Sequence, residues 1–310
     1  MASWEALAKA AALAYGGETS AAGRGGAALV KLAFLRGAPL PLAQPLALPG
    51  KGVGLAATRA VRQGEVVLAV PRALWQPHSG AAALAAARSG APAFAHRIDA
   101  VDARLAAGLA GPGAAPPMSV APLAALAMQI LFATVEGPDA AYVAWLRAAH
   151  PPAAMANAMP AFWGQARRRE LQACELASQG GPLDRLPALA STLHAALFGG
   201  GGMASGGGLA NGSDPEVTKD NGNGPPVALL LWALSLVQSR ATGSAGAAAT
   251  STAAAVGASS PAFHASFPFS LVPYFDLLNH EPGGRPNCAH AFSDTGAYSV
   301  GELDCVSPLS

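Results

Sequence analysis

The sequence of 310 residues predicts an α+β protein with short β-strands near both ends of the chain and a mostly helical region between them. Three observations predict this fold class. Two short apolar runs, at residues 53–57 and 66–70, flank a turn centred on Gly64. Apolar side chains recur at helical spacing through residues 122–150. Strand-like segments return after residue 286, near the C-terminus.

The helical elements follow in order along the chain. The Ala-rich residues 1–17 match either a short amphipathic helix or an organelle transit segment, although Glu5 and Glu18 are unusual for the second. A second helical piece in the middle of the chain begins near Pro160. The compact apolar segment 227–240 predicts a further helix, which must pack on other structure to be stable.

Two segments are predicted to be disordered loops. Residues 199–226 are rich in Gly and Asn, and residues 241–262 consist mostly of small side chains. Beyond them, residues 286–292 and 297–306 read as strands, and the turn-forming residues Asp294, Thr295 and Gly296 separate them. Strands at both ends therefore enclose a helical insertion.

Composition excludes several classes of protein. A net charge of +1 gives no reason to expect nucleic acid as a partner. No apolar stretch reaches the ~18 residues of a membrane-spanning helix, so a soluble protein without a membrane partner is expected. The three cysteines, Cys174, Cys288 and Cys305, form no closely spaced pair and favour a reducing compartment.

A glycine-rich segment at residues 52–57 formally matches the GxGxxG/A fingerprint of dinucleotide-binding proteins. That fingerprint works only when it follows a strand and opens a helix, whereas this segment runs into a strand pattern. The dinucleotide interpretation is therefore rejected. Two readings remain for Gly52 and Gly54: a backbone that a ligand approaches closely, or a tight turn that enters a hairpin.

Four segments together resemble a known family. The pattern G-x-G-L-x-A-x-R-x-V-x-x-G-E-V-V-L-x-V-P resembles the opening of the SET domain of protein-lysine N-methyltransferases. The similarity is to the branch of the RuBisCO large-subunit lysine methyltransferase, in which a helical insertion splits the SET domain. Each piece occurs in the order of that branch: residues 52–71, then Ser239 and Arg240, then residues 271–273 with Asp276, and finally Asn279 and His280.

This resemblance implies an organisation. Residues 1–50 would form a helical lead-in and residues 51–78 the first part of the SET domain. Residues 79–265 would be the helical insertion that carries the two loops, and residues 266–310 an incomplete second part. The resemblance further implies a monomer, a chloroplast or cytoplasmic location, and a protein substrate that bears a target lysine.

It also implies a cofactor, S-adenosylmethionine, and the residues that hold it. Arg240 would hold the carboxylate of the cofactor, while Asp276 would have a structural role and tie the knot-like core of the domain. The cofactor-binding residues implied by the resemblance are Gly52, Val53, Gly54, Ser239, Arg240, Asn279 and His280. No metal is implied.

The catalytic tyrosine of the family has no counterpart in this sequence. Tyr298 comes too early and lies in a strand-like context, so no catalytic residue is assigned. Two alternatives stay open. The sequence is a fragment of a methyltransferase, or it is an inactive SET-like scaffold that binds a partner protein.

Two other kinds of site compete with this interpretation. Asp276, His280, Cys288 and His290 are possible zinc ligands, although their spacing lacks the usual closely spaced pairs. On a helix, Asp276 and His280 would also be neighbours, as a hydrolase would need, but no G-x-S-x-G segment supplies a nucleophile. Taken singly, Ser239 with Arg240 reads as a helix cap, and Asn279 with His280 as a buried polar cluster.

Overall fold

The computed structural model has an α+β composition, mostly helical, with small antiparallel sheets. Its backbone divides into two compact units. The first comprises Met1–Ala82, Ala133–Ala149 and Arg240–Ser310, and the second Ala83–Phe132 and His150–Ser239. The structure describes residues 3–48, 52–62, 64–109, 119–132, 140–164, 166–167, 170, 185–199, 225–242, 270–278, 288–292 and 298–302.

The first unit begins with two helices that pack against each other, α1 (Trp4–Ala14) and α2 (Ala21–Leu35). A serine caps each of them: the Ser3 hydroxyl accepts a hydrogen bond from the Ala6 N–H (3.1 Å), and the Ser20 hydroxyl one from the Gly23 N–H (2.8 Å). The helical interpretation of the N-terminal segment is confirmed.

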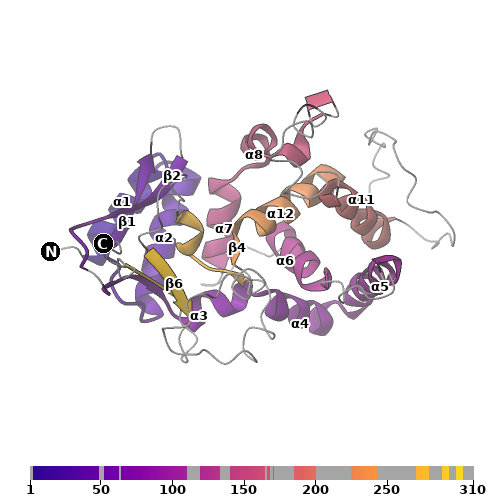
Figure 1. Ribbon diagram of the computed structural model, residues 1–310, viewed down its shortest axis with the longest axis horizontal. Coiled ribbons are helices and arrows are strands. Elements are labelled where there is room, and N and C mark those ends of the chain that lie inside the picture. Colours follow the sequence, from indigo (N-terminus) through magenta and orange to yellow (C-terminus); the bar gives the residue numbers. More distant parts are fainter. Residues whose placement is uncertain are drawn as a thin grey trace, which may run out of the picture. The chain divides into compact units, whose positions relative to one another are not determined.

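Small residues allow α2 to approach its neighbours closely. A Cβ at Gly23 would lie 2.0 Å from the Gly17 carbonyl oxygen, far inside a normal contact. Helix α7 (Ala140–Ala149) packs on α2 as well, and both helices lie beside each other in Figure 1. Glycine therefore lets α2 pack tightly between two partners.

The two strands predicted near the N-terminus exist, but they do not pair with each other. β2 (Gly52–Ala57) pairs antiparallel with β1 (Ala43–Leu48), a strand that the sequence did not reveal. β3 (Val66–Val70) pairs instead with β7 (Tyr298–Glu302). The predicted turn between the runs is confirmed at Gly64, where φ is +76°.

One sheet joins the two ends of the sequence. Its strand order is β3-β7-β6, all antiparallel, with β6 at Cys288–Phe292. Val70 lies opposite Tyr298 in β7, and Tyr298 lies opposite Phe292 in β6. Both predicted C-terminal strands are confirmed over Cys288–Phe292 and Tyr298–Glu302, and the remaining residues of the two patterns lie outside the described residues.

The first unit also contains short elements that connect these sheets. After β3 come α3 (Arg72–Trp75) and the 3₁₀ helix η1 (Gln76–His78). The pair β4 (Ala241–Thr242) and β5 (Ser270–Leu271) is followed by the 3₁₀ helix η3 (Phe275–Leu277). Because β4 is a strand, the loop prediction is wrong for residues 241–242. The remainder of both predicted loops, apart from residues 199 and 225–226, lies outside the described residues.

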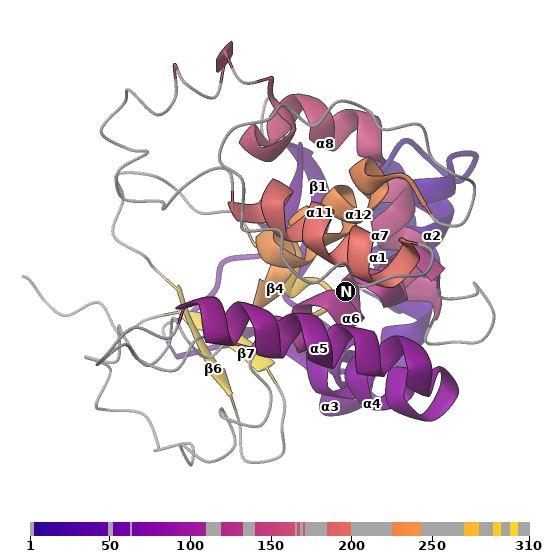
Figure 2. The same cartoon turned by 90° about the vertical axis from the view of Figure 1, so that its right-hand side faces the viewer.

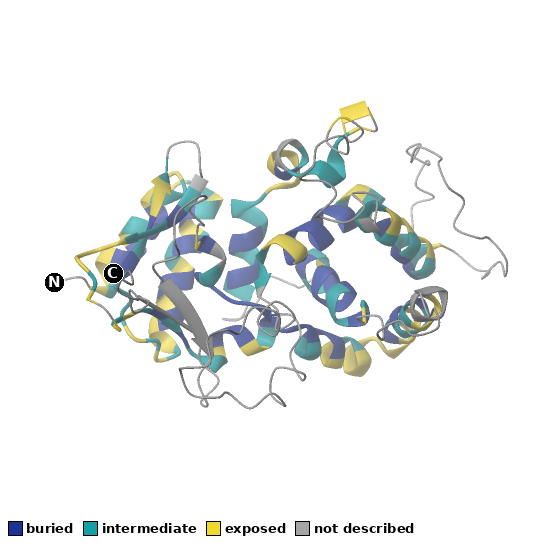
Figure 3. Ribbon diagram, viewed as in Figure 1, coloured by how far each residue is buried: buried dark blue, intermediate teal, exposed yellow. Residues whose placement is uncertain are grey.

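The second unit is helical in its described part (Figure 2). The helix predicted over residues 227–240 is confirmed as α12, of which only Arg240 belongs to the first unit. Figure 3 shows most of α12 as buried, in keeping with its apolar sequence. Of the piece predicted from Pro160, the structure describes the 3₁₀ helix η2 (Pro160–Phe162) and residues 163–164, 166–167 and 170. The remaining elements of this unit are α4 (Gly80–Gly90, entering from the first unit), α5 (Pro92–Leu109), α6 (Ala121–Phe132), α8 (Pro152–Ala158) and α11 (Arg185–Phe198).

Side-chain hydrogen bonds to the backbone connect the helices of this unit. The Arg97 guanidinium of α5 donates to the Leu197 carbonyl at the end of α11 (2.8 Å). The Trp232 indole N–H of α12 donates to the His150 carbonyl (2.8 Å). Within the described ranges of both units, no helix is long and apolar enough to span a membrane.

Candidate functional site

The candidate site lies in the first unit, where distant segments of the sequence meet. Directly after Arg240, β4 pairs antiparallel with β5, so that Ala241 lies opposite Leu271. A few residues beyond β5, η3 packs against β2. Two of the four segments that resemble the SET family, residues 52–71 and residues 271–276, therefore contact each other through β2–η3 packing, and the two residues after Arg240 pair with β5.

A second strand-like contact supports β5. Ser79, which follows η1, forms an isolated antiparallel bridge with Ser270, and both side chains are fully buried. The Ser79 hydroxyl donates to the Gln76 carbonyl (2.9 Å) and accepts a hydrogen bond from the Ala82 N–H (3.2 Å). These bonds satisfy the buried hydroxyl and fix the end of η1 beside β5.

The glycine segment has an extended conformation. Gly52, Val53 and Gly54 lie in β2, opposite Leu48, Ala47 and Leu46 of β1. Gly54 is buried. Gly52 begins β2 directly after residues 49–51, which join the two paired strands and lie outside the described residues, so the reading of a turn that enters a hairpin stays a prediction. A close approach to the backbone remains possible, since Gly54 presents no side chain.

Ser239 and Arg240 end helix α12. The Ser239 hydroxyl is exposed and donates to the Leu236 carbonyl of its own helix (3.2 Å), as a helix-terminal serine commonly does. Arg240 is half-buried and leads directly into β4. Of this pair, Arg240 is the residue directly before β4, the strand that pairs with β5.

Asp276 lies in η3, next to β2, but its side chain is not among those that the structure describes. Asn279 and His280 lie outside the described residues. The 3₁₀ helix ends at Leu277, and Leu278 is extended with φ −70° and ψ 114°. An uninterrupted helix from Asp276 to His280, which the hydrolase alternative needs, is therefore not formed.

The possible zinc ligands are not brought together by anything that the structure describes. Cys288 and His290 both lie in β6, whose side chains are not described, and His280 lies outside the described residues. Among the described residues, no three His, Cys, Asp or Glu side chains are close enough to hold a metal ion.

A row of aromatic rings in the first unit was missed by the sequence analysis. Tyr142 and Trp145 of α7 stack with ring centroids 5.7 Å apart, as their helical spacing of three residues allows. The Trp145 ring meets Tyr15 edge-on (5.5 Å), and the Tyr142 ring meets His78 (5.0 Å). Because His78 precedes Ser79, this row connects α1 and α7 to the segment that supports β5.

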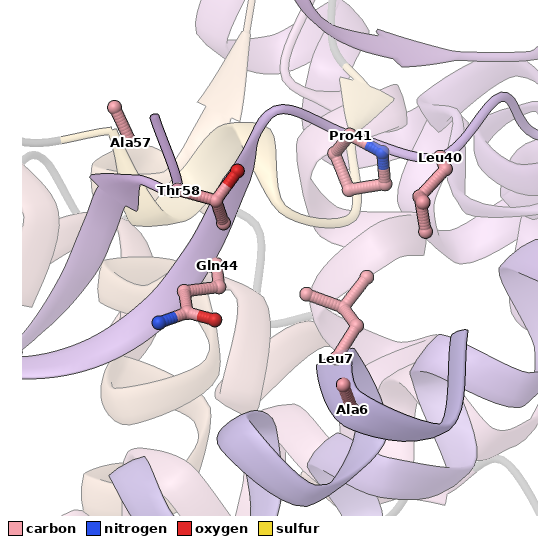
Figure 4. Close-up of a pocket in the computed structure, with 7 residues that line it drawn as sticks. All are labelled: Ala6, Leu7, Leu40, Pro41, Gln44, Ala57 and Thr58. Carbon is pink, nitrogen blue, oxygen red and sulfur yellow. The ribbon is translucent and has the colours of Figure 1, made fainter. Parts of the chain in front are cut away.

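A pocket of about 340 Å³ lies at the opposite end of β2 from its glycines. Figure 4 shows Leu7, Leu40 and Pro41 on one side of this space and Gln44 and Thr58 on the other. The Thr58 hydroxyl donates to the Leu42 carbonyl (3.0 Å). None of the residues implied for the cofactor lines this pocket.

Arg240 carries a planar guanidinium, the kind of cation that pairs with a carboxylate, and Gly52 and Gly54 of β2 carry no side chain. No family model matches the chain, and no curated protein matches it either.

Proposed function

We propose that this chain binds S-adenosylmethionine and transfers its methyl group to the side-chain amine of a lysine in a protein substrate. The observation that carries the proposal is the contact between motif segments that lie far apart in the sequence. The segment after Arg240 pairs with β5, and η3 packs on the glycine-containing β2. A single cofactor site built from these segments would require them to lie close together in the fold.

The described residues suit the proposed cofactor in two respects. The guanidinium of Arg240 can form two parallel hydrogen bonds with the carboxylate of an amino acid. Gly54 has no side chain that would obstruct a ligand at the backbone of β2. Asn279 and His280, which follow η3 in the chain, would contact the adenine and amino-acid ends.

The protein would contribute alignment and burial to the reaction. When bound, S-adenosylmethionine supplies an activated methyl group on a sulfonium. The acceptor lysine must be neutral, and an apolar surrounding lowers the pKa of an amine. Leu271 and Val272, both buried beside η3, supply apolar surface in this region. Most of the rate enhancement would come from holding the amine in line with the methyl group.

Calorimetric titration with S-adenosylmethionine tests the binding step. We expect Arg240→Ala to weaken binding roughly tenfold to a hundredfold, because a charge-assisted pair is lost. Arg104→Ala is the matched control, since Arg104 is an exposed arginine on helix α5. Equal affinity of the wild type and a folded Arg240→Ala variant would reject Arg240 as a ligand. Failure of the wild type to bind at millimolar cofactor would reject the whole proposal.

Transfer is tested separately with tritiated S-adenosylmethionine and lysine-containing peptide arrays. Label that appears in lysine supports the methyltransferase proposal. Cofactor binding without transfer to any lysine would favour the second candidate, an inactive SET-like interaction scaffold. The observation behind that candidate is that Tyr298, the tyrosine nearest the expected position, lies within a strand paired on both sides.

A further inference from the structure

A tyrosine occupies a turn position that normally requires glycine. Tyr274 has φ +67° and ψ −27°, and it is the one non-glycine residue with positive φ among the described residues. The Phe275 N–H donates to the Val272 carbonyl (3.1 Å), which closes a four-residue turn. With Pro273 second and a positive φ third, this turn has the pattern of type II, which favours glycine or asparagine at the third position.

Burial of the tyrosine ring holds this unfavourable backbone. A side chain in the left-handed region suffers a steric clash between its Cβ and the backbone, so it persists only when the surroundings enforce it. Tyr274 is 5% exposed, and the residues before it, Leu271 and Val272, are 1% and 0% exposed. The ring is therefore anchored in the core of the first unit while its backbone makes a sharp corner.

This corner redirects the chain between the two contacts that form the candidate site. Before it, β5 is paired with β4 and bridged to Ser79. After it, the Tyr274 carbonyl accepts a hydrogen bond from the Leu277 N–H (3.1 Å), which closes η3 against β2. Tyr274 is thus the third residue of the turn and also the N-cap of the 3₁₀ helix.

We infer that Tyr274 is a positioning residue: its buried ring locks the left-handed corner that directs η3 onto β2. The inference rests on the proposed function, because the segment that it directs carries Asp276 and leads to Asn279 and His280. Tyr274 itself is not assigned a contact with the substrate or the cofactor.

A glycine–alanine pair at one position tests the backbone conformation. Tyr274→Gly and Tyr274→Ala both remove the ring, but only alanine is strained at positive φ. We expect the glycine variant to melt at a higher temperature than the alanine variant. At Phe275, inside the 3₁₀ helix, the same pair should give the opposite order, because φ there is ordinary. If the Tyr274→Ala variant were as stable as the Tyr274→Gly variant, the left-handed backbone conformation at this position would be rejected.

Hydrogen exchange and cofactor titration test the positioning. In Tyr274→Gly we expect the Leu277 and Leu278 amides to exchange faster, and the dissociation constant for S-adenosylmethionine to rise at least about tenfold. Tyr274→Phe keeps the ring and should retain wild-type exchange and affinity. Unchanged amide protection and unchanged affinity in a folded Tyr274→Gly variant would overturn the inference.

The two proposals fail in different ways. If the wild-type protein does not bind S-adenosylmethionine, the proposed function is wrong, whatever the variants do. The melting order and the exchange of the Leu277 and Leu278 amides then still decide whether Tyr274 holds η3 in place. If the wild type binds and the glycine variant binds equally well, only the role of Tyr274 is rejected.

Discussion

Gly25 of α2 lies directly against Trp145 of α7. A Cβ added at Gly25 would be 3.1 Å from the Trp145 Cα and 3.2 Å from its Cβ. These are backbone-proximal atoms that cannot rotate away, unlike the end of a flexible side chain. The close approach lets Trp145, which is 1% exposed, stack on Tyr142 inside the first unit.

A larger side chain at Gly25 should therefore separate the two helices. We expect Gly25→Val to lower the free energy of unfolding by about 1–3 kcal/mol through overpacking. Gly90→Val is the matched control, because a Cβ at Gly90 meets nothing within 4 Å and the cost of valine in a helix is similar. Urea denaturation measures both. Equal losses in the two variants would show that the contact with Trp145 is not restrictive.

Asp102 should stabilise the start of α6. Its carboxylate accepts hydrogen bonds from the Val120 N–H (2.6 Å) and the Ser119 hydroxyl (2.7 Å), at the N-terminus of that helix. We expect Asp102→Ala to cost about 1 kcal/mol in unfolding free energy, as the loss of a helix cap does.

Asp99, which lies with Asp102 on helix α5, provides the comparison, as the variant Asp99→Ala. Asp99 pairs with Arg88 at 3.0 Å on the exposed surface, where an ion pair contributes ~0–1 kcal/mol. Chemical denaturation of both variants separates the two roles. A larger loss at Asp99 than at Asp102 would contradict the capping assignment.

The Glu65 carboxylate should titrate far below its ordinary range. Hydrogen bonds from the Arg59 guanidinium, and secondarily from the Arg62 backbone N–H, lower its pKa from 4.5 to about 2. Because the folded-state pKa is the lower one, the stabilisation is present above pH 4.5 and is lost as the pH falls toward 2. NMR titration of the carboxyl carbon measures this pKa directly.

Removing the largest cause of this shift should raise the pKa of Glu65. In Arg59→Met, the carboxylate loses the guanidinium and keeps the weaker backbone donor, so we expect its pKa to move toward 4.5. Arg104→Met, on a different unit, should leave it unchanged. An Arg59→Met protein with the wild-type titration curve would show that the pair is not formed in solution.

Trp232 should connect α12 to the segment before α8. Its indole N–H donates to the His150 carbonyl at 2.8 Å, and its side chain is 4% exposed. Trp232→Phe keeps most of the apolar volume but removes the donor, so we expect a loss of about 1–3 kcal/mol from the unsatisfied carbonyl. Thermal unfolding measures the loss, and an unchanged melting temperature would mean that water replaces the indole.

Local sequence patterns predicted many of the elements, but they missed strand β1. The β-branched run at residues 66–70 and the apolar run before Arg240 correspond to β3 and α12. β1 escaped prediction because its sequence, AQPLAL, has no β-branched residue and contains Pro45. Proline is tolerated there because β1 is paired on one edge only, with β2, in the described sheet.

For the candidate site, the sequence supplied the segments and their order, but not the contacts between them. Nothing local indicates that β2 turns away from β3 to pair with β1, or that β4 exists at all. The strained conformation of Tyr274 was equally hidden, since local preference assigns that turn position to glycine. Only burial of the ring among distant residues overrides the preference.

The sequence by itself determined the serine caps at Ser3 and Ser20 and the turn at Gly64, because these depend on neighbours a few residues away. Only the tertiary structure decided that Val70 pairs with Tyr298 and that Thr242 pairs with Ser270. Strand pairing between the two ends of a chain depends on which apolar faces can be buried together, and that free energy is a property of the whole fold.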